Sequence, residues 1–168
     1  MDLKEIQNEL INENLDGWLF YNFQNRDLIA TRILGLDEKS HSSRRWFYLI
    51  PATGEPQKLV SMVEPKSLDS LPGKTNFYLS WVKQHELLKD ILKNSNKIAM
   101  QYSPFNKIPY VSIVDAGTIE LIRSWEIQIK SSAELIQKFD GIISEEEFLS
   151  HKKAGKILHK ITNLLMIQ

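Results

Sequence analysis

Residues 44–63 read RRWFYLIPATGEPQKLVSMV, and this stretch contains two β-rich runs separated by a turn. The runs cover Arg45–Ile50 and Lys58–Val63, and proline and glycine lie between them. Strand-favouring runs on either side of such a turn predict an antiparallel hairpin. Because apolar or aromatic side chains occupy both faces of Trp46–Ile50, we expect this strand to lie inside the sheet.

The residues before the hairpin predict a helix, a buried strand and a second helix. Four apolar residues of the first segment recur at helical spacing: Leu3, Ile6, Leu10 and Ile11. An Asp-Gly pair then precedes the apolar run Trp18–Tyr21, which indicates a buried strand. We expect the second helix to run from Asn25, as its N-cap, to Leu34, with Gly35 ending it.

After the hairpin, a pattern of strand, helix and strand predicts a crossover unit. The strand Asn76–Ser80 leads into a helix with leucine and isoleucine at helical spacing, and Lys97–Gln101 is the next strand. A crossover of this kind joins parallel strands, so part of the sheet is expected to be parallel. Strict alternation of apolar and polar residues along Trp125–Lys130 is typical of a half-exposed edge strand. Together these elements predict an α/β fold.

Capping patterns predict where the later helices begin. Three boxes are present: Ser112-x-x-Asp115, Ser131-x-x-Glu134 and Ser144-x-x-Glu147. The last box opens a helix whose apolar stripe consists of Ala154, Leu158, Ile161 and Leu165. This helix has no C-terminal cap, for which there are two explanations: its end docks on the core, or the chain is part of a longer one.

The composition fits one globular domain, with 168 residues, 42% of them hydrophobic and 25% charged. Lys+Arg number 21 and Asp+Glu number 21, so the net charge indicates no polyanionic partner. The absence of cysteine excludes disulfides and thiolate metal sites. The N-terminus lacks the apolar core of a signal peptide, and no apolar run approaches the roughly 18 residues of a membrane span. We therefore expect a cytoplasmic protein with no nucleic-acid and no membrane partner.

Motifs that resemble catalytic or metal sites are incomplete. Gly73–Thr75 reads GKT, but the first glycine of a phosphate-binding loop would fall on Leu68. His85 begins a zinc-helix pattern whose second histidine is replaced by Lys89. We therefore assign no catalytic residue, no metal ligand and no cofactor to this chain.

Two adjacent arginines at the start of the hairpin are the strongest candidates for a binding role. Arg44 and Arg45 follow His41 and precede Trp46, and successive strand residues point to opposite faces. At least one guanidinium is therefore expected to reach a carboxylate or a neighbouring subunit. The alternative is an ordinary start of a strand with structural ion pairs. The candidate contacts to substrate or partner subunit are Arg44, Arg45, Trp46 and, at another strand end, Trp81.

Four stretches carry a resemblance to a known family. Residues 102–125, YSPFNKIPYVSIVDAGTIELIRSW, and 129–158, IKSSAELIQKFDGIISEEEFLSHKKAGKIL, resemble the amino-terminal half of Xaa-Pro aminopeptidases and prolidases of the M24 metallopeptidase family. Residues 16–36, DGWLFYNFQNRDLIATRILGL, and the hairpin look like the same half. The resemblance implies a creatinase/prolidase-type amino-terminal domain, with a ribonuclease-H-like mixed sheet of about six strands flanked by helices. It places that domain at residues 1–143 and, at 144–168, a helix leading towards a catalytic domain absent from this chain.

The resemblance also implies a function for which this chain lacks the chemistry. M24 enzymes hold two divalent metal ions, usually Mn, Co or Zn, with two aspartates, a histidine and two glutamates of the carboxy-terminal domain, and none of those motifs is present. The expected role is therefore a non-catalytic domain that builds a homodimer and closes one side of a site for proline-containing peptides. Its partner would be its own catalytic domain. Two alternatives stay open: a peptide- or protein-binding module of an inactive M24-like protein, and the amino-terminal domain of a creatinase-like C–N hydrolase.

Overall fold

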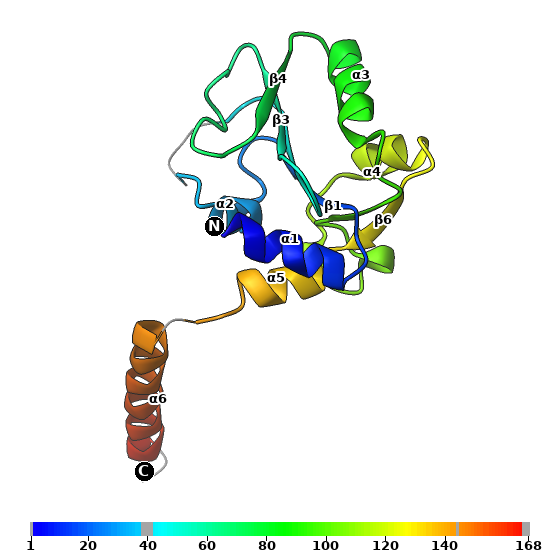
Figure 1. Ribbon diagram of the computed structural model, residues 1–168. Coiled ribbons are helices and arrows are strands. Elements are labelled where there is room, and N and C mark those ends of the chain that lie inside the picture. Colours follow the sequence, from blue (N-terminus) through cyan, green and yellow to red (C-terminus); the bar gives the residue numbers. More distant parts are fainter. Residues whose placement is uncertain (1, 38–41, 144, 166–168) are drawn as a thin grey trace.

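A computed structural model describes residues 2–37, 42–143 and 145–165 of the chain. Within these ranges a six-stranded sheet is covered by helices on both faces, which confirms the predicted α/β fold (Figure 1). The strands are β1 Gly17–Asn22, β2 Trp46–Pro51, β3 Gln57–Ser61, β4 Lys74–Tyr78, β5 Lys97–Met100 and β6 Gln128–Ser131. The α-helices are α1 Leu3–Asn12, α2 Leu28–Leu34, α3 Trp81–Leu92, α4 Ala116–Arg123, α5 Ala133–Phe139 and α6 Glu145–Leu165.

The sheet is mixed, with the strand order β4-β3-β2-β1-β5-β6. Strand β2 is antiparallel to both of its neighbours, whereas the pairs β1–β5, β5–β6 and β3–β4 are parallel. The predicted hairpin, the interior position of its first strand, the parallel part of the sheet and the edge position of the last strand are all confirmed. Strand β2 alone runs against the other five strands. The carboxyl ends of those five strands therefore lie at the same end of the sheet.

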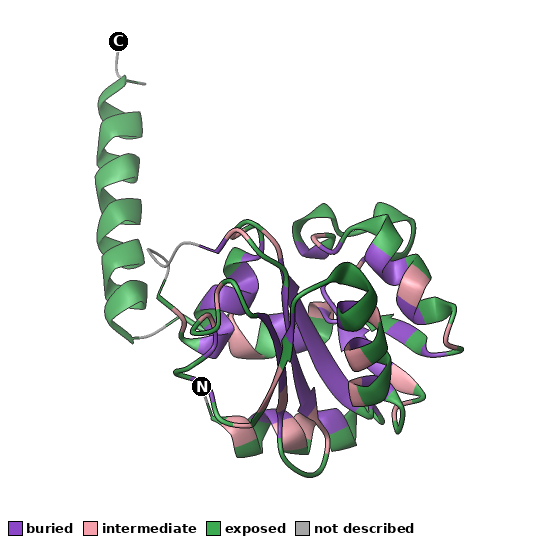
Figure 2. Cartoon of the chain, turned by 90° about the horizontal axis from the view of Figure 1, so that it is seen from above, coloured by how far each residue is buried: buried purple, intermediate pink, exposed green. Residues whose placement is uncertain are grey.

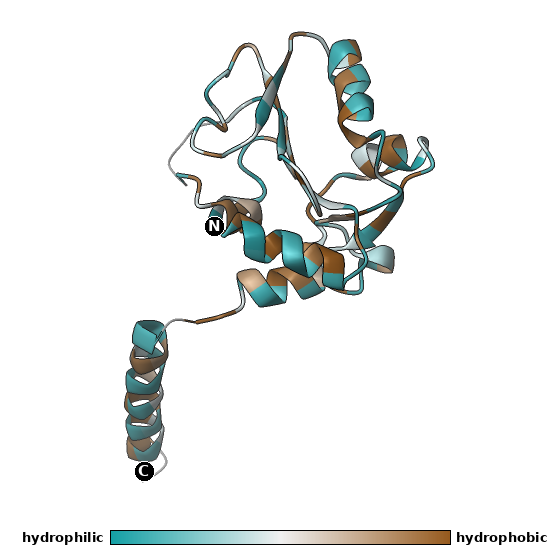
Figure 3. Cartoon of the chain, viewed as in Figure 1, coloured by the Kyte–Doolittle hydropathy of each residue, from teal (hydrophilic) through white to brown (hydrophobic). Residues whose placement is uncertain are grey.

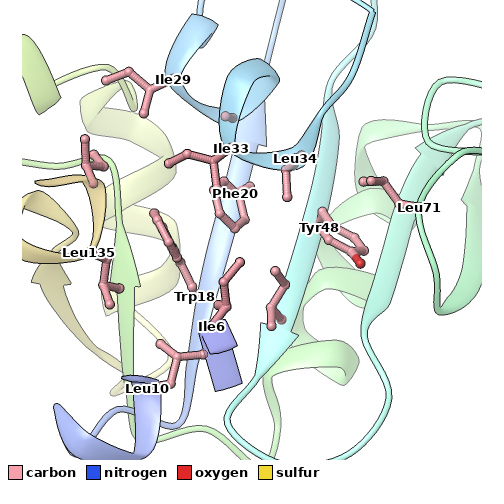
Figure 4. Close-up of a cluster of buried hydrophobic side chains, with 14 of the residues drawn as sticks. Ile6, Leu10, Trp18, Phe20, Ile29, Ile33, Leu34, Tyr48, Leu71 and Leu135 are labelled. Carbon is pink, nitrogen blue, oxygen red and sulfur yellow. The ribbon is translucent and has the colours of Figure 1, made fainter. Parts of the chain in front are cut away.

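Alternating side chains of the central strands supply two separate cores. In β1, Trp18 and Phe20 pack with α1, α2 and α5, while Leu19 and Tyr21 face α3 and α4. Figure 4 shows the first core, in which Trp18 stacks on Phe20 with ring centroids 4.3 Å apart. The continuous apolar run therefore reflects a strand covered on both faces. The predicted helical face of α1 is confirmed for Leu10, which is fully buried, but Ile11 lies outside it at 55% exposure.

The bounds of α2 and β4 differ from those predicted. Asn25 is not the N-cap of α2, because the chain passes through a left-handed turn there, with φ of 53°. Asp27 caps the helix instead and accepts a hydrogen bond from the Ala30 N–H at 2.8 Å. Gly35 ends the helix in the left-handed conformation, as predicted. Strand β4 begins and ends two residues before the predicted Asn76–Ser80, and it cannot reach Ser80 because that residue caps α3.

The capping boxes were predicted less well than the elements that follow them. Asp115, and not Ser112, caps α4 by accepting a hydrogen bond from the Thr118 N–H at 2.9 Å. Helix α5 begins one residue later than its box predicts, and its N-cap Ser132 makes no side-chain capping bond. The box at Ser144 lies outside the described residues. Strand β6 begins only at Gln128, because Glu126 has a φ of 65° that no strand accommodates.

The connector from β5 to α4 is tied to two helices on the first face of the sheet. It contains two short 3-10 turns, Pro104–Asn106 and Pro109–Val111. The Tyr110 hydroxyl accepts a hydrogen bond from Arg32 of α2 at 2.9 Å, and Arg32 also pairs with Asp140 at the end of α5 at 2.6 Å. This junction fixes the point from which the chain continues towards α6.

Helix α6 is the most exposed element of the described chain. Figure 2 shows it outside the layered body, and none of its residues is buried. Figure 3 shows hydrophobic and hydrophilic bands along it, and Leu158, Ile161 and Leu165 of the predicted stripe are 65%, 49% and 70% exposed. The explanation in which this stripe docks on the core is therefore not observed. Within the part of the chain that the structure describes, no helix is long and apolar enough to cross a membrane.

Candidate ligand-binding pocket

A cavity of about 370 Å³ opens next to the carboxyl ends of β1, β3 and β4. It brings together three of the four predicted contact residues, Arg44, Arg45 and Trp81. The other lining residues are two aromatic, two polar and two aliphatic ones: Phe23, Tyr78, Ser61, Gln84, Val63 and Leu79. In open α/β sheets, the crevice outside the carboxyl ends of the strands is the usual place for a ligand.

A carboxylate behind the cavity holds the backbone of Arg44. Glu64 accepts hydrogen bonds from the Ser43 N–H at 3.0 Å, the Ser43 hydroxyl at 2.5 Å and the Arg44 N–H at 3.1 Å. Burial favours the neutral form of Glu64, but these hydrogen bonds outweigh it and lower the pKa of this carboxyl group. Glu64 therefore stays ionised and fixes the segment that carries Arg44.

Contacts from three other elements hold Arg45. Its carbonyl oxygen accepts a hydrogen bond from the Tyr78 hydroxyl at 2.6 Å, and burial raises the pKa of that hydroxyl. Its guanidinium donates to Gln84 Oε1 at 3.5 Å and lies 5.7 Å from the centroid of the Phe23 ring. Arg26 approaches the same ring at 5.7 Å, so two cations flank Phe23. The position of Arg45 is thus set before any ligand arrives.

The arginines carry charge that the described residues do not neutralise by ion pairing. Among those described residues, no salt bridge involves Arg44 or Arg45, and no aspartate or glutamate lines the cavity. Asp115 lies close enough for Arg45 to influence it: burial raises the pKa of Asp115, but hydrogen bonds from Thr118 and the Arg45 charge outweigh that effect and lower it. The alternative of structural ion pairs is therefore not observed here.

Strand alternation predicted that the two arginines point to opposite faces of the sheet, but the structure shows that they do not. Strand β2 begins at Trp46, so Arg44 and Arg45 precede it and both line the cavity. Trp46 is instead only 3% exposed and belongs to the core beneath α1 and α2. Trp81 is 69% exposed, and its ring makes an edge contact with His85 at a centroid distance of 5.4 Å. His41 lies outside the described residues.

Sequence reasoning missed the other side chains of this cavity. Phe23, Tyr78 and Ser61 lie at or just after the carboxyl ends of β1, β4 and β3, and Gln84 belongs to the first turn of α3. Their positions at the ends of predicted strands could have indicated that they share a site, but only if the order of the strands in the sheet had been known. The described lining side chains offer cations, hydrogen-bond donors and apolar surface, and they include no histidine or carboxylate. The groups that are present suit the cavity to binding a ligand.

Metal ligands are absent from the described part of the chain, where no three His, Cys, Asp or Glu residues lie together in a way that could hold an ion. A two-metal hydrolytic centre needs several carboxylates around the ions. The described residues do not fit such a centre.

Comparison with known proteins identifies the fold. No protein-family model matches the sequence, and no curated protein is significantly similar to it. Among solved structures, the amino-terminal domain of an Xaa-Pro dipeptidase from Lactobacillus brevis matches with a TM-score of 0.59 and 11% identity, covering 82% of this chain and 99% of that one. The creatinase/prolidase amino-terminal domain of a dipeptidase from Streptococcus pyogenes matches with a TM-score of 0.57 and 13% identity, covering 81% and 96%.

A larger protein shows how much of a prolidase this chain spans. The prolidase from Pyrococcus horikoshii matches with a TM-score of 0.59 and 17% identity over 94% of this chain, but only 40% of the prolidase is covered. At these identities the likeness establishes the fold: the chain has the architecture of a creatinase/prolidase amino-terminal domain.

Proposed function

We propose that this chain is the non-catalytic amino-terminal domain of an Xaa-Pro peptidase. The observation that supports the proposal most is the size of the match: the fold corresponds to nearly all of an isolated dipeptidase amino-terminal domain and to less than half of a whole prolidase. Residues 1–143 form the domain in this proposal, and 144–168 lead towards a separate catalytic domain.

The hydrolytic chemistry belongs, in this proposal, to that catalytic domain. Two divalent ions there would activate water and polarise the scissile carbonyl group. The described residues of this chain offer no group of three potential ligands, and the proposal therefore assigns the metal ions to the other domain. The contribution of the chain is to shape the site and to hold the assembly together.

Exposed apolar side chains support a role in assembly. At the β4 edge of the sheet, Met62 and Phe77 are 58% and 47% exposed. An edge strand and large exposed apolar residues both favour contact with another protein surface. We propose a homodimer that uses this edge, and we propose that the exposed stripe of α6 packs on the catalytic domain.

The cavity supports a role at the substrate site. Arg44, Arg45 and Trp81 are the proposed contacts to substrate or to a neighbouring subunit, because they share one opening and lack acidic partners in the described residues. For Trp46 the proposal is an indirect one: its buried indole ring supports the start of β2, directly after Arg45.

Any protein sequence that follows Gln168 in the intact protein tests the proposal. Two aspartates, a histidine and two glutamates in the M24 arrangement there would support a peptidase. A related domain in which those ligands are replaced would contradict it and favour the peptide-binding module. Hydrolysis of creatine in place of Xaa-Pro peptides would favour the creatinase-like C–N hydrolase.

A further inference from the structure

The cavity at the carboxyl ends of β1, β3 and β4 combines two arginine side chains with an exposed apolar wall. The Glu64 carboxylate holds the backbone of Arg44, and Tyr78 and Gln84 hold Arg45. Among the described residues, no acidic side chain lines the cavity and no ion pair involves either arginine. An arginine fork matches the two oxygens of a carboxylate, so the charge that best complements this part of the cavity is an anionic, planar group.

The apolar wall restricts which chemical group of the ligand can lie next to that anion. Val63, Leu79 and Trp81 line the same cavity and are 59%, 73% and 69% exposed. Large apolar side chains clustered at the surface of a monomer mark a place where another apolar group binds. The volume of about 370 Å³ falls near the lower end of the range of about 300–1,000 Å³ typical of small-ligand sites. A ligand of the size of a short peptide fits these limits.

We infer that this cavity binds the carboxylate of a peptide at Arg44 and Arg45, with the adjoining apolar side chain of that peptide against Trp81. The inference deepens the proposed function and rests on it for the kind of ligand, a peptide. The carboxylate has two possible sources, the C-terminus of the peptide or an acidic side chain. The residues named in this inference all belong to the 168-residue chain, so a titration of that chain tests it.

The test is a titration of the isotope-labelled 168-residue chain, followed by nuclear magnetic resonance at the Trp81 indole and the arginine side chains. The probes are acetyl-Ala-Leu with a free carboxylate, the same peptide as its amide, and acetyl-Asp-Leu amide. We expect at least one carboxylate peptide to bind about tenfold or more tightly than the uncharged amide, since charge-assisted hydrogen bonds are lost in the amide. Tighter binding of the first probe assigns the carboxylate to the C-terminus, and tighter binding of the third assigns it to a side chain.

Matched variants locate the binding. Arg44→Met and Arg45→Met are each expected to weaken binding about tenfold. Arg123→Met removes the same charge from α4, where Arg123 contacts Tyr102 outside the cavity, and is expected to leave binding unchanged. The dispersed spectrum of each variant reports that it is folded.

Several results overturn the inference. They are equal binding of acid and amide, no binding of either carboxylate peptide, and equal effects of the Arg44, Arg45 and Arg123 substitutions. Stronger binding of inorganic phosphate than of either peptide at the same arginines also overturns it. These results are independent of catalysis: peptide binding in a protein whose intact form hydrolyses no Xaa-Pro peptide would keep this inference and refute the peptidase.

Discussion

Asp27 is a buried carboxyl group whose ionisation opposes folding. It is 0% exposed, and its Oδ1 caps α2 by accepting the Ala30 N–H at 2.8 Å. Its Oδ2 has no hydrogen-bond partner among the described residues. Burial raises the pKa of Asp27 to about 6, although hydrogen bonds from the Ala30 and Ile29 N–H groups act in the other direction.

The raised pKa sets the sign and the size of a pH effect. The folded-state pKa of about 6 lies above the ordinary value of 3.8, so the folded protein binds the proton more tightly than the unfolded chain. The protonated carboxyl group therefore favours folding below about pH 4, and this contribution is lost as the pH rises towards 6. At about 1.36 kcal/mol per pH unit the whole effect is about 3 kcal/mol, of which about 2 kcal/mol falls between pH 4.5 and 7.5.

Asp27→Asn removes the charge and keeps a good N-cap, because asparagine caps helices about as well as aspartate. Urea denaturation at pH 4.5 and 7.5, followed by circular dichroism, measures the free energy of unfolding of both proteins. The stability of the variant relative to the unsubstituted protein is expected to rise by about 2 kcal/mol from the lower to the higher pH.

Asp115→Asn is the matched control. Asp115 also caps a helix, but its pKa is lowered, so its contribution is present above its ordinary pKa and is lost only as the pH falls below that range. This control is therefore expected to show little pH dependence between pH 4.5 and 7.5. The same pH dependence for the Asp27→Asn variant and the unsubstituted protein would refute the reasoning about Asp27.

Three further perturbations test the fold and the site. Leu10→Ala is expected to lower the free energy of unfolding by about 2–5 kcal/mol, because Leu10 is fully buried. Ile11→Ala should change it by less than about 0.5 kcal/mol, because Ile11 is exposed. Equal effects of the two substitutions in urea denaturation would contradict the assigned face of α1. A double-mutant cycle of Arg32→Ala and Asp140→Ala is expected to give a coupling of about 1 kcal/mol, since Arg32 is partly exposed, and a coupling of zero would mean that the junction contributes nothing. Arg45→Ala is expected to weaken peptide affinity or dimerisation of the intact protein without unfolding the domain, and unchanged kinetics and sedimentation would exclude Arg45 from the site.

The architecture was largely predictable because the pattern of apolar residues along the chain agrees with the positions of the strands in the sheet. Trp18–Tyr21 and Trp46–Ile50 are apolar on both faces, and both become central strands covered by helices on both sides. The caps of two helices were less predictable, since each helix has two candidate residues shortly before its start: Ser112 and Asp115 before α4, and Ser131 and Ser132 before α5. The alternating run from Trp125 indicated a strand three residues too early, because the conformation of Glu126 is set by the turn that follows α4.

The cavity was only partly predictable. Arg44 and Arg45 were identified as an unusual pair before a buried strand, and their shared opening follows from the strand beginning one residue after them. Tryptophan is a residue type that is common in binding sites, but the position of Trp46 in β2 places its side chain in the core. The partners Tyr78 and Gln84 come from distant parts of the chain, so only the strand order brings them to the arginines. The cytoplasmic location, the dimer and the domain boundary remain predictions.

Hydrolysis of Xaa-Pro dipeptides with added manganese tests the central claim most directly. The assay compares the 168-residue chain with a longer form of the protein that includes a catalytic domain, at equal molar concentration. The longer form is expected to release proline, and this chain is expected to release none above the buffer control. Proline release by the 168 residues alone, or its absence from a longer form that has intact metal ligands, would contradict the assignment of this chain as the non-catalytic domain of an Xaa-Pro peptidase.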